Sequence, residues 1–364
     1  MQRPVTIRQV ASRAGVSPAT VSRVLAGSPR VDPRLRARTL AAIDQLAYRT
    51  NQVARALRTS STGTIGMVVA DIVNPFFPVI IQAVERQLRT QDAQLLLCDS
   101  EDDVGKEAEL VASLLDHRID GILICPCDRV ASRDALQLAA TRVPVVQFDR
   151  VASRALDYVG VHQDQAMAAI VAHLQAQGCG SFCYVTFSPR ASTAAERLRG
   201  YRRAVGAIDP PSAGRVYEGA ATFSFGQEAG RAILGSAKLP GAIVCANDLI
   251  ALGVLDHLKG RGVAVPSDVL VTGFDDTLLA AVSSPTLTSM RQPLEEIGRK
   301  AAEIVLRADH GQRARPLLLE AKLVVRASSG ARQGVDERPA GRPFGPLAPP
   351  CSPAHDSERW QSKR

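Results

Sequence analysis

Apolar and polar positions alternate along residues 17–27 in the pattern of a short amphipathic helix. Val21, Val24 and Leu25 recur at helical spacing, so they form one apolar face while the residues between them point outward. Ser17 is a favourable N-cap, because its hydroxyl accepts from the free backbone N–H groups of the first turn. The glycine that closes this range can end the helix in a left-handed conformation.

A second short helix is expected just before this one. Residues 6–13 begin with Thr6, and Gln9 follows at the spacing of a capping box. Residues 14–16 form a tight turn, and an amphipathic helix that starts near residue 32 would cover the first two. Two short helices joined by a Gly-containing turn, the second presenting small polar groups and an arginine, are typical of the helix-turn-helix that fits a DNA major groove.

A different pattern starts at Ile65, where short apolar runs alternate with amphipathic stretches. The expected strands are 65–70, 94–98, 121–125, 143–148, 181–186, 242–246 and 269–273. The expected helices are 78–90, 104–117, 164–177, 194–206, 226–235, 248–260 and 293–307. Near-continuous apolar strands with helices on both faces predict a parallel, doubly wound sheet. Because the units are too many for one small sheet, we expect an α/β body of two doubly wound lobes behind an all-α head, with a ligand at the carboxyl ends of the strands.

Positive charge is concentrated at the start of the chain. The sequence has 364 residues and a net charge of +8. Residues 1–60 contain 11 arginines and no lysine against two aspartates, whereas the remaining residues carry 33 basic and 34 acidic side chains. A basic head on a neutral body indicates a module that binds a polyanion. The alternative, an ordinary solvated basic surface, does not account for the capped helices in the same segment.

The sequence carries no pattern typical of a metal site or an enzyme. Its seven cysteines lack the second pair or the histidines of a zinc site, so we expect small buried hydrophobic residues. It has no phosphate-binding loop, GxGxxG motif or nucleophile elbow, and we therefore expect neither catalysis nor a cofactor. An odd cysteine count, an N-terminus unlike a signal peptide and no apolar run of about 20 residues favour a cytoplasmic protein without a membrane span.

Several segments, in their order along the chain, are similar to one known family. VTIRQVASRAGVSPATVSRVLAG is followed by NQVARALR and TIGMVVADIVNPFF, and later by ERLRGY, PGAIVCANDLIALGVLDHL and VPSDVLVTGFDD. This ordered set, over about residues 4–326, resembles the LacI/GalR (lactose-repressor) family of bacterial transcription regulators. The resemblance implies a DNA-binding head in 1–50, a hinge helix and linker in 51–63, and a periplasmic-binding-protein-like body for effector binding and dimerisation in 64–330.

Residues 331–364 form the last expected segment. They are rich in proline, glycine and charge and show no periodicity, so we expect a disordered tail. The tail has no leucine heptads, and nothing in it indicates a coiled coil for tetramerisation.

The resemblance also implies a homodimer that binds an approximately palindromic double-stranded DNA operator. The expected DNA contacts are Thr6, Ser17, Pro18, Ala19, Thr20, Ser22, Arg23, Asn51, Ala54 and Leu57. The hydroxyls would anchor phosphates, and Arg23 would either read a guanine or contact a phosphate. Leu57 would enter the minor groove as a wedge, or else pack within the hinge helix. Thr50 departs from the family, which often has proline there, and this loosens the start of the hinge.

By the same resemblance, the effector-binding positions fall on eight residues of the body. These are Phe76, Phe77, Asp149, Arg150, Arg197, Phe225, Asn247 and Asp275. A forked arginine, a carboxylate and an amide can pair with adjacent sugar hydroxyls, while an aromatic ring covers the C–H face. Phe223 is an alternative to Phe225 as the stacking ring, and Asn247 could simply cap the helix that follows it.

Together these observations predict a repressor controlled by a small-molecule effector, with a sugar or sugar derivative expected. The effector would change the closure of the two lobes and thereby the docking of the hinge helices on the operator. One alternative is a corepressor-dependent regulator with a nucleoside or nucleobase-type ligand. A periplasmic sugar receptor would share the lobes but not the basic head, and a constitutive DNA-binding protein would not need the pocket residues.

Overall fold

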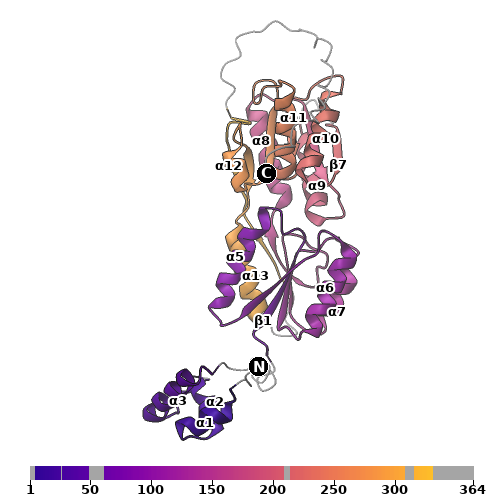
Figure 1. Ribbon diagram of the computed structural model, residues 1–364. Coiled ribbons are helices and arrows are strands. Elements are labelled where there is room, and N and C mark those ends of the chain that lie inside the picture. Colours follow the sequence, from indigo (N-terminus) through magenta and orange to yellow (C-terminus); the bar gives the residue numbers. More distant parts are fainter. Residues whose placement is uncertain (1–4, 26, 49–60, 209–213, 308–314, 331–364) are drawn as a thin grey trace, which may run out of the picture.

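The computed structural model describes residues 5–25, 27–48, 61–208, 214–307 and 315–330. It has a helical head at its N-terminus and a body of two α/β lobes (Figure 1). The fold class predicted from the sequence is therefore confirmed. Residues 51–60 of the predicted hinge and the predicted tail, 331–364, lie outside the described residues.

Three helices form the head: α1 (Ile7–Ala14), α2 (Pro18–Leu25) and α3 (Pro33–Gln45). The predicted capping box is present, because the Gln9 N–H donates to Thr6 Oγ1 and the Thr6 N–H donates to Gln9 Oε1 over 2.8 Å. Gly15 turns the chain between α1 and α2 with a φ of 64°. Leu25, predicted for the apolar face, is 36% exposed at the end of α2. The buried core of the head consists of Val10, Ala11, Ala14, Val21 and Ala42.

The first lobe is built on a parallel sheet with helices on both faces. Its strands, in spatial order, are β11 (Pro316–Leu319), β5 (Asp157–Val161), β4 (Val145–Phe148), β3 (Gly121–Ile124), β1 (Thr64–Val69) and β2 (Gln94–Asp99). Its helices are α5 (Phe76–Arg89), α6 (Val104–Asp116), α7 (Arg133–Ala140) and α13 (Leu294–Arg307). Helices α5 and α13 bury one face of the sheet, and α6 and α7 bury the other (Figure 1).

The second lobe repeats this arrangement with one antiparallel edge. Its strands, in spatial order, are β12 (Lys322–Val324), β10 (Thr288–Arg291), β9 (Leu270–Asp275), β8 (Ala242–Cys245), β6 (Phe182–Phe187) and β7 (Val216–Gly219). Only β12, among the described strands, runs antiparallel to its neighbour. Its helices are α8 (Gln163–Ala176), α9 (Ser192–Gly206), α10 (Phe223–Leu234), α11 (Asp248–Gly260) and α12 (Leu278–Val282).

The chain passes between the lobes three times. It crosses from β5 to α8, returns from β10 to α13, and crosses again from β11 to β12. The late elements α13 and β11 therefore complete the first lobe. All seven strands predicted from the sequence are present, whereas β5, β7, β10, β11 and β12 and the helices α7 and α12 were not predicted.

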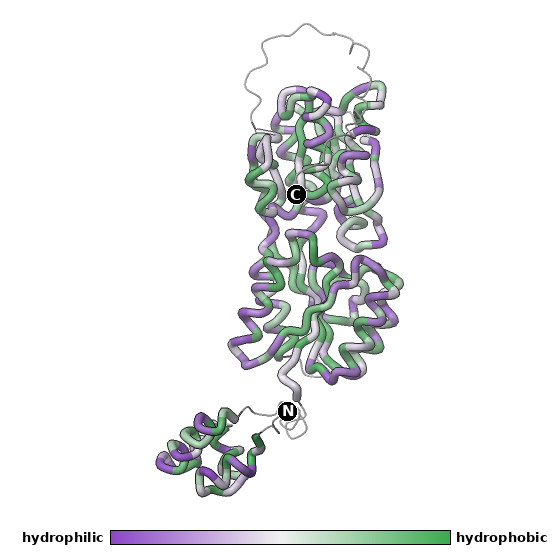
Figure 2. The backbone as a smooth tube through the Cα atoms, in the orientation of Figure 1, coloured by the Kyte–Doolittle hydropathy of each residue, from purple (hydrophilic) through white to green (hydrophobic). Residues whose placement is uncertain are grey.

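Hydrophobic residues follow the central strands of both sheets, and hydrophilic residues cover the outer faces of the helices (Figure 2). Of the cysteines within the described ranges, Cys98 is half-buried and the others are buried, and none of these forms a disulfide. This matches the prediction of small buried hydrophobic residues. No helix in the described parts of the chain is long and apolar enough to cross a membrane.

Candidate ligand pocket and DNA-reading head

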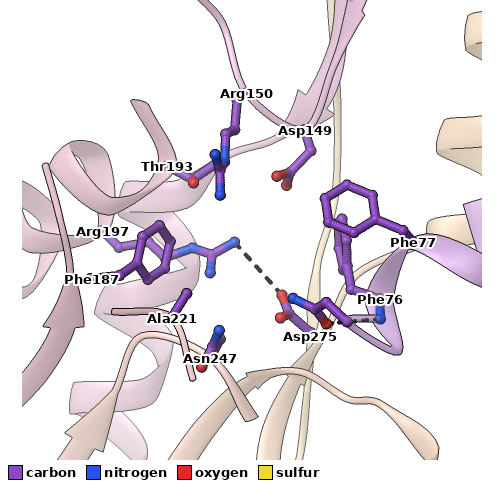
Figure 3. Close-up of a pocket in the computed structure, with 11 residues that line it drawn as sticks. Phe76, Phe77, Asp149, Arg150, Phe187, Thr193, Arg197, Ala221, Asn247 and Asp275 are labelled. Carbon is purple, nitrogen blue, oxygen red and sulfur yellow. Dashed lines mark hydrogen bonds and ion pairs between the residues drawn. The ribbon is translucent and has the colours of Figure 1, made fainter. Parts of the chain in front are cut away.

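A polar pocket lies between the two lobes, at the carboxyl ends of strands from both sheets (Figure 3). It is lined by Asn74, Phe76, Phe77, Asp149, Arg150, Phe187, Thr193, Arg197, Ala221, Asn247 and Asp275. Seven of the eight residues predicted for effector binding are in this set, and Phe225 is the exception. The fold thus brings together side chains that lie far apart in the sequence.

Most lining side chains project from a strand end or from the helix that follows it. Asp149 and Arg150 come directly after β4, and Asp275 is the last residue of β9. Asp149 and Asp275 have φ values of 58° and 108°, which residues other than glycine rarely adopt. Such backbone strain is concentrated at functional sites. Here both carboxylates are turned toward the pocket (Figure 3).

Arg197 occupies the centre of the pocket and is only 3% exposed. Its Nε donates to Gln163 Oε1 over 2.7 Å, and its Nη1 donates to the backbone oxygen of Ala246 over 2.6 Å. The guanidinium carbon lies 3.7 Å from the centre of the Phe274 ring, in cation–π geometry. The remaining nitrogen, Nη2, lies 3.8 Å from Asp275 Oδ1. These contacts fix the guanidinium in one orientation.

The pocket carboxylates are held in an environment that disfavours their charge. Burial raises the pKa of Asp275 well above its usual range, and Arg197 opposes the shift. Burial also raises the pKa of Asp149, against the effect of Arg197 and Arg150. Asp149 Oδ1 and Arg150 Nε are buried without a hydrogen-bond partner among the described residues. Because unpaired buried polar atoms cost free energy, a polar ligand that paired with them would be stabilised here.

The position of Asn247 is compatible with both interpretations made from the sequence, a helix cap and a pocket residue. Its side-chain oxygen accepts from the Ile250 N–H over 2.9 Å, so Asn247 caps α11. The same side chain also lines the pocket (Figure 3). Since the oxygen is used by the cap, the amide N–H groups remain for a ligand.

The aromatic ring predicted from α10 does not line this pocket. Gly226 packs directly against the backbone of α11, and this contact turns the neighbouring Phe225 toward Gly219 instead. The alternative, Phe223, is 41% exposed and is not a lining residue either. Phe187 instead contributes an aromatic ring to the lining, and the Arg150 guanidinium carbon lies 5.8 Å from its ring centre. Phe187 ends β6 and directly follows the strand predicted at 181–186, so its position at a carboxyl end was the available signal.

Three other lining residues were also missed by the sequence reasoning. Asn74 accepts from the Phe76 N–H over 3.1 Å and so orients the start of α5. Thr193 lies in the first turn of α9, and Ala221 lies in the loop before α10. None of the three stands in a pattern that distinguishes it from an ordinary loop or cap residue.

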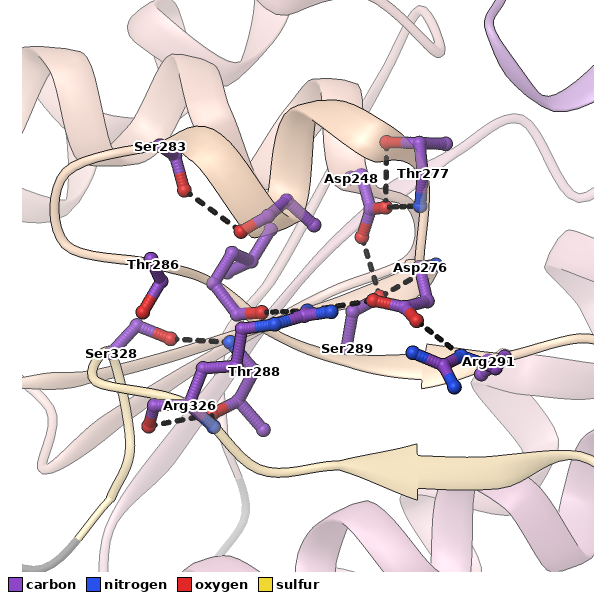
Figure 4. Close-up of polar contacts among 12 residues, drawn as sticks. Asp248, Asp276, Thr277, Ser283, Thr286, Thr288, Ser289, Arg291, Arg326 and Ser328 are labelled. Atoms are coloured by element: carbon purple, nitrogen blue, oxygen red, sulfur yellow. Dashed lines mark hydrogen bonds and ion pairs between the residues drawn. The ribbon is translucent and has the colours of Figure 1, made fainter.

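A polar network fixes the segments beside the pocket (Figure 4). Asp248 follows Asn247, and its buried carboxylate accepts from the Thr277 N–H over 2.7 Å and from Thr277 Oγ1 over 2.9 Å. Ser289 Oγ donates to the same carboxylate over 2.6 Å. Burial raises the pKa of Asp248 to about 6, although these hydrogen bonds lower it. The network joins the start of α11 to α12 and β10.

Asp276 extends the network on the other side of Asp275. Its carboxylate forms ion pairs with Arg291 and with Arg326, both at 2.6 Å. The Asp276 N–H donates to Ser289 Oγ over 2.9 Å. The backbone that carries the pocket carboxylate of Asp275 is therefore held by its neighbour in the sequence.

In the head, α2 presents the predicted DNA-reading surface away from the core residues Val21 and Val24. Its start is fixed by Ser17, whose Oγ accepts from the Thr20 N–H over 3.1 Å. The described residues predicted to contact DNA are all exposed or half-buried: Thr6, Ser17, Pro18, Ala19, Thr20, Ser22 and Arg23. The predicted hinge contacts Asn51, Ala54 and Leu57 lie outside the described residues.

The head and part of the body each match a known protein family. Residues 6–51 match the family described as bacterial regulatory proteins, lacI family, and residues 171–329 match the periplasmic binding protein-like domain. Catabolite control protein A from Priestia megaterium is 33% identical over 83% of this chain and 91% of its own length. The HTH-type transcriptional repressor PurR of Photobacterium profundum is 31% identical over 89% of this chain and 98% of its own length.

A solved structure gives the same result for the fold. The lac repressor dimer bound to operator and the anti-inducer ONPF superposes with a TM-score of 0.82 at 25% identity, over 90% of this chain and 99% of that chain. The relatives found are transcriptional regulators and not enzymes. The chain therefore belongs to the lacI family of bacterial regulatory proteins and is a DNA-binding, repressor-like transcriptional regulator.

Proposed function

We propose that this chain is a repressor whose affinity for operator DNA is controlled by a sugar or sugar derivative bound between the lobes. The observation that carries the proposal is a buried set of charged and amide groups that converges from both lobes: Asp149, Arg150, Arg197, Asn247 and Asp275. Donors and acceptors placed side by side suit the paired hydroxyls of a sugar ring. Aromatic rings in the lining suit its C–H face.

The pocket is nearly closed in this arrangement of the lobes. Its free volume is 30 Å³, and a water needs about 10–15 Å³ by the same measure. A ligand of sugar size therefore needs the lobes to move apart. Such a movement would change contacts that join them, namely the ion pair of Arg190 with Asp128 at 2.8 Å and the bond from the Val151 N–H to Ser192 Oγ at 2.8 Å.

The first lobe also holds the chain that leads to the head. The Asp120 carboxylate accepts from the Gly63 N–H over 2.7 Å, from the Thr62 N–H over 2.9 Å and from Ser61 Oγ over 2.7 Å. A movement of the first lobe is therefore passed directly to residue 61. In a dimer, it would separate or join the two hinges and so control whether Leu57 enters the minor groove.

The proposed operator-binding form is a homodimer. Leu278 and Val282 on α12 are 77% and 68% exposed, and Val79 on α5 is 38% exposed. Helices α5 and α12 lie along the same side of the body (Figure 1). Large exposed apolar residues along one side of both lobes favour a protein interface. A two-fold interface would present two heads to an approximately palindromic operator.

The test begins with an operator selected from random double-stranded DNA by the full-length protein. Fluorescence anisotropy then measures operator affinity with and without a panel of sugars and nucleosides. We expect Arg197→Ala to bind the operator normally and to lose the ligand response, since it removes the central donor of the pocket. Arg199→Ala, an exposed arginine on the same helix, is the matched control. A normal ligand response in Arg197→Ala would contradict the proposal.

A corepressor-dependent regulator with a nucleobase-type ligand is the second candidate. It draws support from the three phenylalanines of the lining, since Phe76 and Phe77 meet edge to face at 5.1 Å and Phe187 adds a third ring. Planar bases stack on such rings. In this case a purine or pyrimidine, and no sugar, would change operator affinity, and the change would be an increase.

A further inference from the structure

A larger cavity adjoins the pocket between the lobes. Its volume is 530 Å³, against 30 Å³ for the inner pocket. The two share Asn74, Phe77, Arg150, Phe187 and Ala221 as lining residues, so these side chains stand between neighbouring spaces. Together they fall within the range of about 300–1,000 Å³ that is typical of ligand sites. The inner pocket alone is only one end of the space.

The outer cavity has an excess of negative charge. Its lining includes four carboxylates, Asp71, Asp99, Glu101 and Asp102, and two cations, Arg150 and Arg190. Arg150 is paired with Asp102, Arg190 with Asp128 outside the lining, and Glu101 with Lys106. Among the described residues, Asp71 and Asp99 form no ion pair.

The chain segments that carry these two carboxylates are neighbours at the edge of the first sheet. Asp99 ends β2 and is paired in register with Val69, the last residue of β1, while Asp71 follows β1 by two residues. One oxygen of each accepts a backbone N–H, from Val73 over 2.9 Å and from Glu101 over 3.1 Å. Among the described residues, no hydrogen bond reaches the second oxygen of either carboxylate.

A buried donor stands where the two spaces meet. Arg150 lines both of them and is 7% exposed, and its Nε has no hydrogen-bond partner among the described residues. The neighbouring Asp149 Oδ1 is likewise buried and unpaired on the inner side. Polar atoms without a partner among the described residues therefore line both spaces: those of Asp149 in the inner pocket, of Arg150 at the junction, and of Asp71 and Asp99 in the outer cavity.

The chemistry of this series limits the ligand. A carboxylate or phosphate group in the outer cavity would face Asp71 and Asp99, whose carboxylates form no ion pair among the described residues, and would be disfavoured by their charge. Hydroxyl groups would instead donate to Asp71 and Asp99 in charge-assisted hydrogen bonds. Phe77 and Phe187, which border both spaces, would cover the apolar faces of two successive rings.

We propose that the effector is a neutral sugar of at least two units. Once the lobes have moved apart, one unit occupies the inner pocket with Arg197 and Asp275, and the next unit lies in the outer cavity with its hydroxyls on Asp71 and Asp99. This inference rests on the proposed function, in which the pocket between the lobes holds the effector.

The first test is a thermal-shift panel on the full-length protein. The probes are glucose, galactose, mannose and xylose, neutral disaccharides built from them, gluconate, galacturonate, glucose 6-phosphate and adenosine. We expect a neutral disaccharide to raise the melting temperature more than its own monosaccharides do. A larger shift from an acid, a phosphate, adenosine or a monosaccharide overturns the proposal, as does a panel in which no disaccharide stabilises the protein.

The second test uses Asp71→Asn and Asp99→Asn, which keep the oxygen that accepts the backbone N–H. Calorimetry with the best disaccharide should show affinity reduced roughly tenfold in each variant, with monosaccharide binding unchanged. Asp116→Asn, an exposed carboxylate at the end of α6, should have no effect. Unchanged disaccharide affinity in both cavity variants overturns the inference.

The two proposals fail in different ways. If a monosaccharide releases the operator as well as any disaccharide does, the two-unit effector is wrong while ligand control of DNA binding stands. If ligands bind in the pocket but operator affinity never changes, the proposed function is wrong.

Discussion

Replacement of Arg197 by methionine removes the charge at the centre of the pocket while keeping much of the side-chain volume. The change deletes the hydrogen bonds to Gln163 and Ala246 and the contact with the Phe274 ring. It also leaves Asp275 buried without its counter-charge. Removing one partner of a buried pair costs about 3–5 kcal/mol. We expect a loss of unfolding free energy of that order at pH 8, without any ligand present.

The titration of Asp275 gives this loss a pH dependence. Arg197 is the largest influence that lowers the pKa of Asp275 against burial, so the pKa rises further in the variant. Above the ordinary carboxyl pKa, the folded variant then binds a proton that the unfolded chain releases. Stability falls with rising pH wherever the folded state binds more protons. The deficit relative to the wild type is therefore largest at pH 8 and shrinks toward pH 4.

Urea unfolding followed by circular dichroism at pH 5 and pH 8 measures both effects. The double variant Arg197→Met/Asp275→Asn serves as the second arm, because a neutral amide needs no counter-charge. We expect it to be more stable than Arg197→Met at pH 8, with a much weaker dependence on pH. An equal loss at both pH values, together with no recovery in the double variant, would refute the reasoning.

Four further predictions concern the network, the hinge and the tail. Because the pKa of Asp248 is raised to about 6, stability falls as pH rises from about 4 to 6; Asp248→Asn should lose this part of the slope in urea unfolding, and an identical slope would contradict it. Leu57→Ala should keep weak, salt-sensitive DNA binding but lose specific operator affinity; unchanged affinity at two salt concentrations rejects the wedge. Asp120→Ala should bind ligand normally in thermal-shift assays yet release the operator poorly, and normal release would show that the anchor transmits nothing. Deletion of 331–364 should leave dimer and DNA binding intact, whereas loss of the dimer in sedimentation would make the tail structural.

The pocket was accessible to sequence reasoning because its polar residues stand at the ends of apolar runs. Asn247 and Asp275 each follow or end a strand that is plainly hydrophobic, and parallel strands bring such positions to one edge. The identity of the aromatic ring was less accessible. Phe225 is directed by the close packing of Gly226 on α11, and the rotation of a helix about its axis depends on that tertiary contact.

The missed strands share a physical reason. β7, β11 and β12 are edge strands of three or four residues, and β5 and β10 mix small, polar and apolar residues. Apart from β11, a four-residue apolar run at the sheet edge, none carries the continuous apolar run by which the central strands were identified. Their strand conformation is supplied by neighbours that are distant in the sequence, such as β5 for β11. Patterns within a short window do not contain this information.

The three crossings between the lobes set the order in which a nascent chain can fold. The three helices of the head are complete by residue 48. The first lobe, in contrast, cannot complete its core until α13, with Ile297 and Val305, and β11 have been synthesised. Domains fold as they leave the ribosome, from the N-terminus onward. The DNA-reading helices are thus ready long before either lobe. A truncated translation product that ends before residue 294 would carry a finished head on a body with exposed apolar surface, able to meet DNA but open to aggregation.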